Sequence, residues 1–192
     1  MLQKFSALNQ NVLFLKDKSF FMETNSAKTS IGTRFAQIAW VVKDIKAAEN
    51  FFRQVIGVPD FVKLENLRSE DLEGTYYAKS GNYVFHLYLA YSGETLIELI
   101  QPVSGQSIFQ DYLIKHPEGG VQHIAYMVPE ADHDKAISEL TQKGYPVITS
   151  LTLPVAKVAF FDTTKEIGVV TEIIGLTGAG VEFLQQLKSG VN

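Results

Sequence analysis

The pattern of apolar and polar residues along this chain occurs twice. Residues 35–42 read Phe-Ala-Gln-Ile-Ala-Trp-Val-Val, and residues 122–128 read Gln-His-Ile-Ala-Tyr-Met-Val. Both stretches are rich in β-branched and aromatic residues, which predicts a strand in each half. A helical spacing follows in each half and ends at a glycine, Gly57 or Gly144, which begins a Gly-x-Pro triplet. Because the landmarks keep one order, the pattern indicates two duplicated modules.

Each module is predicted to contain a strand, a helix and three further strands. In the first module the strands cover residues 35–42, 61–67, 83–91 and 95–101, and the helix covers 44–56. In the second module the strands cover 122–128, 147–151, 155–161 and 169–174, and the helix covers about 132–143. A helix over 108–115 connects the modules, and a short helix over 181–187 lies near the end.

The first predicted helix has a candidate N-cap and one apolar face. Asp44 precedes it as the N-cap, and apolar residues recur at helical spacing behind it. We expect these residues to pack together on the sheet: Ile45, Ala48, Phe52, Val55 and Ile56. The first module is longer than the second, and a polar insertion between Arg68 and Asn82 accounts for the excess.

These elements predict an α+β fold, in which two tandem βαβββ modules form a curved mixed β-sheet with a central concave cavity and helices outside. We place module one at residues 34–102, module two at 121–175 and a helical tail at 176–192. Residues 1–33 are interpreted as an N-terminal extension with a linker over 24–33; it holds one docked helix or, alternatively, is a cleaved presequence. Its longest apolar run has four residues, too short for a signal-peptide core or a membrane span.

Composition and charge exclude several classes of partner. The 192 residues carry a formal charge of −4 and no basic run longer than two residues, so the electrostatic footprint of a nucleic-acid binder is missing. The chain has no cysteine, which excludes disulfides, thiolate metal ligands and a cysteine nucleophile. We expect a cytoplasmic protein that acts on a small molecule and does not bind a membrane.

Polar residues interrupt the apolar strands at equivalent positions of the two modules. Gln37 corresponds to His123, and Glu98 corresponds to Glu172. Side chains alternate along a strand, and the bulkier set around Trp40 should face the helices, which leaves these four residues on the concave face. An ionised glutamate inside an apolar strand is costly unless something compensates its charge. Two such glutamates with one imidazole and one amide predict a divalent metal site with an open position.

Other histidines and tyrosines fit a site less directly. His86 and Tyr88, in the strand over 83–91, are candidate substrate-binding residues, and Tyr77 is a further one. His116 precedes a proline in a loop, and His133 is placed on the exposed side of its helix.

The strand motifs resemble those of the vicinal oxygen chelate superfamily, which includes glyoxalase I, methylmalonyl-CoA epimerase, extradiol dioxygenases and bleomycin-binding proteins. The motifs are Gln-Ile-Ala-Trp-Val-Val from Gln37, Leu-Ile-Glu-Leu-Ile-Gln-Pro around Glu98, Gly-Gly-Val-Gln-His-Ile-Ala around His123, and Thr-Glu at Glu172. The Glu98 and His123 motifs are most similar to the epimerase. The set Gln37, Glu98, His123 and Glu172 is similar to the metal ligands of zinc-type glyoxalase I, whereas the epimerases usually carry histidine at the position of Gln37.

The resemblance implies one divalent ion, zinc, nickel, cobalt or manganese, that binds substrate oxygens and stabilises the enediolate formed by loss of a proton next to a carbonyl. Glu172 or Glu98 would move that proton. An isomerase, epimerase or lyase is therefore expected, with an acyl-thioester, a hemithioacetal or a secondary metabolite as substrate. Extradiol dioxygenation is disfavoured, because it needs two histidines and one carboxylate. The two modules pair within one chain, or the site forms across a dimer; relatives are commonly dimeric, which implies a homodimer.

The alternative function is a metal-free binding protein that sequesters a small molecule in the same cavity. Its support is the supply of aromatic residues, most of which are expected in the core: Phe35, Tyr77, Tyr83, Phe85, Tyr88, Tyr91, Phe160 and Phe161.

Overall fold

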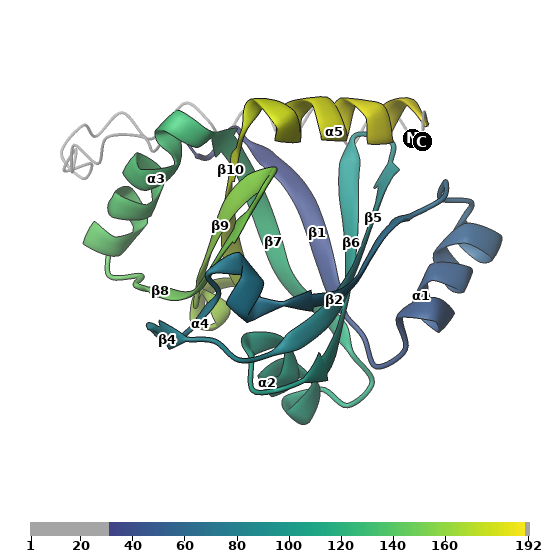
Figure 1. The fold of residues 1–192 in the computed structure, drawn as a ribbon, viewed down its shortest axis with the longest axis horizontal. Coiled ribbons are helices and arrows are strands. Elements are labelled where there is room, and N and C mark those ends of the chain that lie inside the picture. The colour runs from purple at the N-terminus through teal and green to yellow at the C-terminus, as the bar shows by residue number, and fades with distance from the viewer. Residues whose placement is uncertain (1–30, 191–192) are drawn as a thin grey trace, which may run out of the picture.

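The computed structural model describes residues 31–190 (Figure 1). The first half contains β1 (Phe35–Val41), α1 (Ile45–Phe51), the π-helical η1 (Phe52–Ile56), β2 (Val62–Arg68), β5 (Val84–Ser92) and β6 (Thr95–Ser104). Its insertion contains η2 (Ser69–Leu72), β3 (Thr75–Tyr76) and β4 (Lys79–Ser80). The second half contains β7 (Gly120–Pro129), α3 (Glu130–Gln142), β8 (Val147–Leu153), β9 (Ala156–Phe161), α4 (Thr164–Ile167) and β10 (Val170–Leu176). The remaining helices are α2 (Ile108–Lys115) and α5 (Gly178–Ser189).

Eight strands form one mixed sheet in the order β2-β5-β6-β1-β7-β10-β9-β8. Within each half the first strand lies parallel to the last, β1 to β6 and β7 to β10, and the two halves meet through antiparallel β1 and β7. The two halves are thus related by a pseudo-twofold axis between β1 and β7. The sheet curls around its inner face, with α1 and α3 outside it and α5 across one end (Figure 1). The predicted α+β fold of paired modules with a curved sheet is confirmed.

The first helix differs from the prediction in its second half. Ile45 is buried and Phe52 packs beside it, but the side chains of Val55 and Ile56 are 68% and 56% exposed. The backbone changes to a π-helical turn at Phe52, which has more residues per turn, so the spacing of 3.6 residues no longer places Val55 and Ile56 on the sheet. The prediction that all five apolar residues face the sheet is therefore wrong for these two.

The second long helix begins earlier than the spacing predicts, and this changes the environment of His133. The helix α3 begins at Glu130 and no side chain caps its N-terminus, so the sequence contains no capping signal at the true start. His133 faces the sheet and is only 5% exposed. It packs against Gly175, where an added Cβ would lie 2.7 Å from the Cβ of His133. The expectation of an exposed His133 is wrong.

The polar insertion of the first module links the two edges of the sheet. Tyr77 donates its backbone N–H to the carbonyl of Ile148 on β8, at 2.7 Å. The Ser150 N–H donates to Thr75 Oγ1 at 2.9 Å. Leu72 of the same insertion is buried among the central apolar residues. The insertion therefore joins the edge strand β8 of module two to module one and narrows the open side of the curled sheet.

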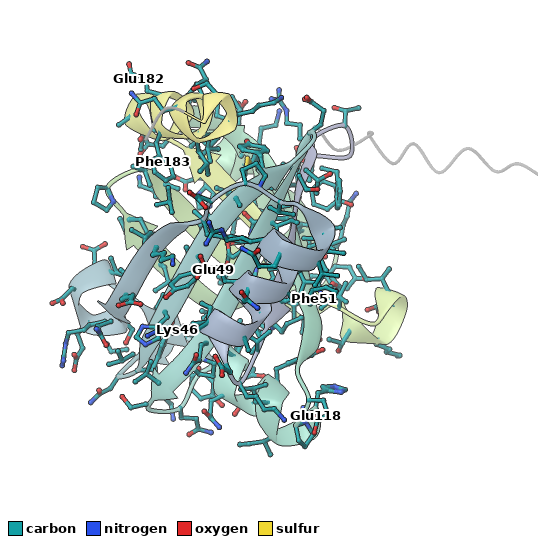
Figure 2. All side chains as sticks on the ribbon, turned by 90° about the vertical axis from the view of Figure 1, so that its right-hand side faces the viewer. Lys46, Glu49, Phe51, Glu118, Glu182 and Phe183 are labelled. Carbon is teal, nitrogen blue, oxygen red and sulfur yellow. The ribbon has the colours of Figure 1, made fainter. Side chains whose placement is uncertain are left out.

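The C-terminal helix α5 packs across one end of the sheet. It begins at Gly178, behind Thr177, whose Oγ1 accepts from the N–H of Gly180 at 3.1 Å. Figure 2 shows Phe183 on the side of α5 that faces the sheet and Glu182 on the opposite side. A Cβ added at Gly180 would lie 2.0 Å from the carbonyl oxygen of Val155, so only glycine permits this close approach.

None of the helices in residues 31–190 is long and apolar enough to cross a membrane. The expected N-terminal helix falls outside these residues, as does the expected linker before Ile31.

Candidate metal centre

The sheet register brings the four polar strand residues together. Ala39 on β1 lies opposite Glu98 on β6, and Ala125 on β7 lies opposite Glu172 on β10. Gln37 is two residues from Ala39, and His123 is two residues from Ala125, so all four polar side chains leave the same face of the sheet. The pseudo-twofold axis between β1 and β7 therefore gathers two equivalent pairs at the centre of the concave face.

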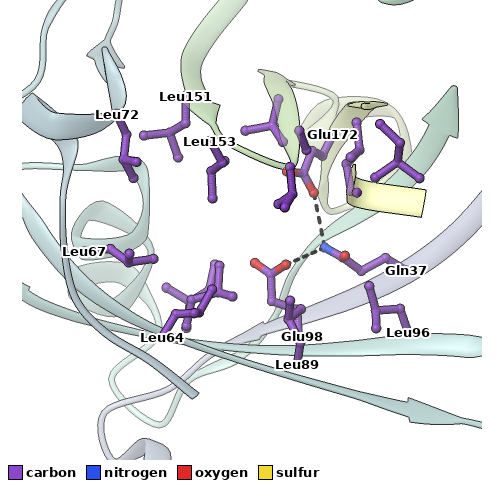
Figure 3. A pocket seen from close by; sticks show the side chains of 18 of the residues that line it. Gln37, Leu64, Leu67, Leu72, Leu89, Leu96, Glu98, Leu151, Leu153 and Glu172 are labelled. Atoms are coloured by element: carbon purple, nitrogen blue, oxygen red, sulfur yellow. Dashed lines mark hydrogen bonds between the residues drawn. The ribbon is translucent and has the colours of Figure 1, made fainter. Parts of the chain in front are cut away.

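The side chains converge within hydrogen-bond range. Nε2 of His123 lies 3.2 Å from Oε2 of Glu172 and 3.8 Å from Oε1 of Glu98. Nε2 of Gln37 donates to Oε2 of Glu98 at 2.7 Å and to Oε2 of Glu172 at 3.2 Å (Figure 3). The ligating atoms of Glu98, His123 and Glu172 all lie within 4.8 Å of one another, so one ion could be held by all three.

Burial disfavours the charged forms of the side chains in this cluster. His123 is fully buried, and the exposed fractions are 6% for Glu98 and 3% for Glu172. Desolvation raises the pKa of Glu98 to about 8, and the neighbouring Glu172 adds to the rise. Desolvation likewise raises the pKa of Glu172 to about 8 and lowers the pKa of His123 to about 4. The donors fit a divalent cation, because its charge would compensate both carboxylates and an uncharged imidazole is the form that binds metal.

The Gln37 amide lies between the carboxylates and compensates part of their charge through its N–H groups. An amide nitrogen is a donor only, so Gln37 could hold a cation only through Oε1, after rotation of the amide about its last side-chain torsion. Glutamine suits this position because one side chain presents donors to bare carboxylates and an acceptor to an ion.

A fifth polar residue, Gln122, supports the imidazole from behind. Its Oε1 lies 2.7 Å from Nδ1 of His123, and Gln122 is 3% exposed. An amide oxygen only accepts, so the contact requires a proton on Nδ1 and leaves the Nε2 lone pair facing the glutamates. Sequence reasoning missed Gln122, although an amide next to a candidate histidine ligand was a usable signal.

Residues of the cluster line a cavity of about 310 Å³. Among residues 31–190, the polar side chains that line this cavity are those of Gln37, Glu98 and Glu172. The other lining residues are apolar or are glycine, and leucines predominate among the side chains in Figure 3. The predicted concave cavity is present, but its leucine-rich wall was not foreseen, because those leucines come from elements distant in sequence.

The two expected substrate-binding residues do not join this cavity. Tyr88 is 1% exposed on the other face of β5, where its hydroxyl donates to Oε1 of Glu65 at 2.6 Å. Nδ1 of His86 accepts the N–H of Asn66 at 3.0 Å. Strand alternation explains the difference, because Phe85, Leu87 and Leu89 occupy the cavity face of the strand. His86 and Tyr88 therefore lie outside this cavity, and their expected contact with a substrate stays a prediction.

The comparisons with known proteins agree with this fold. A family model described as the glyoxalase/bleomycin resistance protein/dioxygenase superfamily matches residues 36–160. The chain belongs to this superfamily. The match includes Gln37, Glu98 and His123, and the resemblance inferred from the strand motifs is confirmed. No curated protein matches the chain.

Several solved structures are similar in fold to this chain. A hypothetical protein from Bacillus halodurans is 23% identical, with a TM-score of 0.56 over 75% of this chain and 94% of that one. Methylmalonyl-CoA epimerase from Mycobacterium tuberculosis is 16% identical, with a TM-score of 0.54 over 81% and 95%. A Streptomyces coelicolor methylmalonyl-CoA epimerase variant in complex with 2-nitronate-propionyl-CoA is 22% identical, with a TM-score of 0.52 over 76% and 95%. At these identities the similarity concerns the fold.

Proposed function

We propose that this protein is a metal-dependent isomerase, epimerase or lyase that moves a proton next to a carbonyl group. The observation that carries the proposal is the buried pair Glu98 and Glu172 around Nε2 of His123, at the wall of an otherwise apolar cavity. Burying two ionised carboxylates costs free energy unless they bind a cation or one of them takes up a proton.

Glu98, His123 and Glu172 would hold the ion, joined by Gln37 through its amide oxygen. Two carboxylates, one imidazole and one amide oxygen form a borderline donor set that suits zinc, nickel, cobalt or manganese. When bound, such an ion polarises a substrate carbonyl and compensates the negative charge that develops beside it.

The remaining chemistry belongs to side chains of the protein. For an isomerase, one of the two glutamates accepts the proton from the carbon next to the carbonyl and returns it to a neighbouring atom. For an epimerase, one glutamate accepts that proton and the other glutamate, in its protonated form, donates a proton to the opposite face of the same carbon. The apolar wall excludes water, which keeps the abstracted proton on the carboxyl group until it is returned. The two glutamates are equivalent in the fold, so the choice between them is a question for mutation.

The direct test is elemental analysis after loading with zinc, nickel, cobalt or manganese and desalting. We expect about one ion per wild-type chain and loss of that ion in Glu98→Gln, Glu172→Gln and His123→Ala. Glu49→Gln is the matched control, because Glu49 is also a buried glutamate, at 6% exposure, but pairs with Lys63 outside the cavity. Retention of metal in all site variants, or no metal in the wild type, would reject the metal site.

The catalytic half of the proposal needs a second measurement. Acyl-thioesters and 2-oxoaldehyde adducts are incubated with the loaded protein in D₂O, and exchange at the carbon next to the carbonyl is followed by NMR. We expect exchange in the wild type and its loss in the variant of whichever glutamate carries the proton. Absence of exchange across this panel, with metal bound, would contradict the proton-transfer role.

A metal-free binding protein is the second candidate, and the apolar cavity is the observation that favours it. Such a protein would need the leucine-rich wall but not the two buried glutamates.

The four candidate ligands all come from one chain, so the site needs no second copy. The expected homodimer and the cytoplasmic location stay predictions.

A further inference from the structure

We infer that the substrate carries an apolar body, an alkyl chain or an aromatic ring, next to the carbonyl end that reacts. The inference deepens the proposed function and rests on it for the placement of the carbonyl end at the metal site. The apolar part of the inference rests on the cavity alone.

The wall of the cavity offers a ligand almost nothing except hydrocarbon contact. Its apolar side chains come from both modules and from α5, with Leu64 and Leu87 from module one, Leu151 and Val158 from module two, and Phe183 from α5. Hydroxyl, amide or charged side chains of the described residues reach the cavity only at Gln37, Glu98 and Glu172. A polar ligand body would exchange its hydrogen bonds with water for apolar contacts, which is unfavourable.

The described residues also place no cationic side chain in this cavity. The Lys63 ammonium group pairs with Glu49 at 2.8 Å, and the Lys157 ammonium group pairs with Glu130 at 3.2 Å. The Arg68 guanidinium pairs with Glu70 at 2.9 Å. A phosphate or a peptide carboxylate inside the cavity would therefore lack a counter-charge.

The polar atoms lie at one place on the sheet, and this fixes the orientation of the ligand. Figure 3 shows Gln37, Glu98 and Glu172 side by side, with leucines such as Leu64, Leu67 and Leu153 lying away from them. The reactive end of the substrate must meet the carboxylates, and the apolar body must lie along the leucines. The cavity volume of about 310 Å³ lies near the lower limit of ligand pockets, which measure about 300–1,000 Å³. A nucleotide or tripeptide portion would have to lie outside it.

The test uses two homologous series and isothermal titration calorimetry. The n-alkanols probe the apolar wall alone, and the n-alkyl hydroxamic acids add two neighbouring oxygens that chelate divalent ions. Each series runs from four to ten carbons and is titrated into the full chain with and without bound zinc. Hydroxamic acids whose chains contain ether oxygens, matched in length, serve as polar counterparts.

The apolar inference predicts that affinity rises about fourfold for each added methylene in both series until the cavity is full, with or without zinc. The ether-containing compounds should bind at least tenfold more weakly than their alkyl counterparts, on the order of 10 to 100-fold for two buried ether oxygens. An affinity that does not depend on chain length, or equal binding of the ether compounds, would overturn the inference.

The zinc arm tests the proposed function separately. Zinc should strengthen binding of the hydroxamic acids and leave the alkanols unchanged, because only the former present paired oxygens. Length dependence without any gain from zinc would overturn the metal-dependent function and leave the apolar substrate class standing. If zinc strengthens binding of the hydroxamic acids but affinity does not depend on chain length, the apolar substrate class is overturned and the metal-dependent function is left standing.

A pair of leucine variants locates the binding. Leu87→Trp places a larger side chain in the cavity and should shorten the longest alkyl chain that binds, with a loss of about tenfold for the longest ligands, equivalent to nearly two methylenes. Leu140→Trp is the matched control, because Leu140 is also partly buried but belongs to α3, on the opposite face of the sheet from the cavity. Equal effects of both substitutions would place the ligand elsewhere and overturn the inference.

Discussion

Replacing Gln122 by leucine should weaken metal binding without changing any proposed ligand. The substitution removes the oxygen that lies 2.7 Å from Nδ1 of His123 and leaves a side chain of similar size. The Nδ1–H of a fully buried imidazole then has no acceptor. The tautomer with the proton on Nε2 becomes populated, and in it Nε2 has no lone pair for the cation.

The magnitude follows from the burial of both partners. Leaving a buried donor unsatisfied costs about 1–3 kcal/mol, and each 1.4 kcal/mol is about tenfold in affinity. Loss of a residue that orients a metal-binding histidine typically weakens metal affinity by about 10–100-fold, which agrees with that range. We therefore expect the dissociation constant for zinc to rise by about 10–100-fold in Gln122→Leu. Gln122→Glu keeps an acceptor and should restore affinity.

The assay is competition for zinc with a chromophoric chelator, run beside thermal unfolding. Gln101→Leu is the matched control, because Oε1 of Gln101 accepts the N–H of Ile45 at 2.9 Å, away from the cavity. Both leucine variants should lose stability, and only Gln122→Leu should lose zinc affinity. Equal zinc affinity in wild type and Gln122→Leu, or failure of Gln122→Glu to restore it, would refute the reasoning.

Three further predictions follow from burial and packing. Burial raises the pKa values of Glu98 and Glu172 to about 8, so protons compete with the cation for these carboxylates. Zinc affinity should therefore fall by about tenfold per pH unit for each displaced proton as the pH drops from 8 to 6. Competition titrations that show the same zinc affinity across this range would contradict the prediction. Burial lowers the pKa of His133, so the unfolded chain takes up a proton below about pH 6.5 before the folded chain does, and the free energy of unfolding should fall below that pH. Urea unfolding at pH values above and below about 6.5 should show a smaller fall in the free energy of unfolding for His133→Asn than for the wild type. An equal fall in both proteins would contradict the role given to His133. Gly180→Ala should destabilise the fold by about 1–3 kcal/mol, because the added Cβ would lie 2.0 Å from the carbonyl oxygen of Val155. Gly178→Ala in the same helix is the control, because its Cβ would meet no atom within 4 Å, and it should be neutral or stabilising. Similar melting points of the two variants in thermal unfolding would contradict the packing of α5.

The repeat made the sheet and the cluster of polar residues predictable from sequence. Strand alternation is local, so the face of Gln37 or Glu98 follows once the strand is recognised. The repeat then supplies the long-range step, because equivalent strands of two modules meet at equivalent positions. For His86 and Tyr88 the same alternation was available, since Leu87 and Leu89 are the residues of β5 that face the cavity.

The remaining differences have non-local causes. No capping side chain marks the start of α3, and the π-helical turn at Phe52 leaves no trace in the apolar spacing. The sequence predicts a short helix over 181–187, but only the packing of Gly180 against Val155 shows where α5 lies on the sheet. Such contacts depend on the tertiary fold, which local patterns do not encode.

The two modules have diverged where the candidate ligands need different support. His123 must keep one tautomer, and Gln122 holds it by accepting the Nδ1 proton. The residue equivalent to Gln122 in module one is Ala36, which has no side-chain acceptor for Gln37. Glutamine needs none, since its amide carries both a donor and an acceptor and rotation chooses between them. A fixed imidazole opposite a rotatable amide lets one pair of glutamates be stabilised both by N–H groups and by a cation. Two histidines held in the Nδ1–H tautomer would present no N–H group to the glutamates.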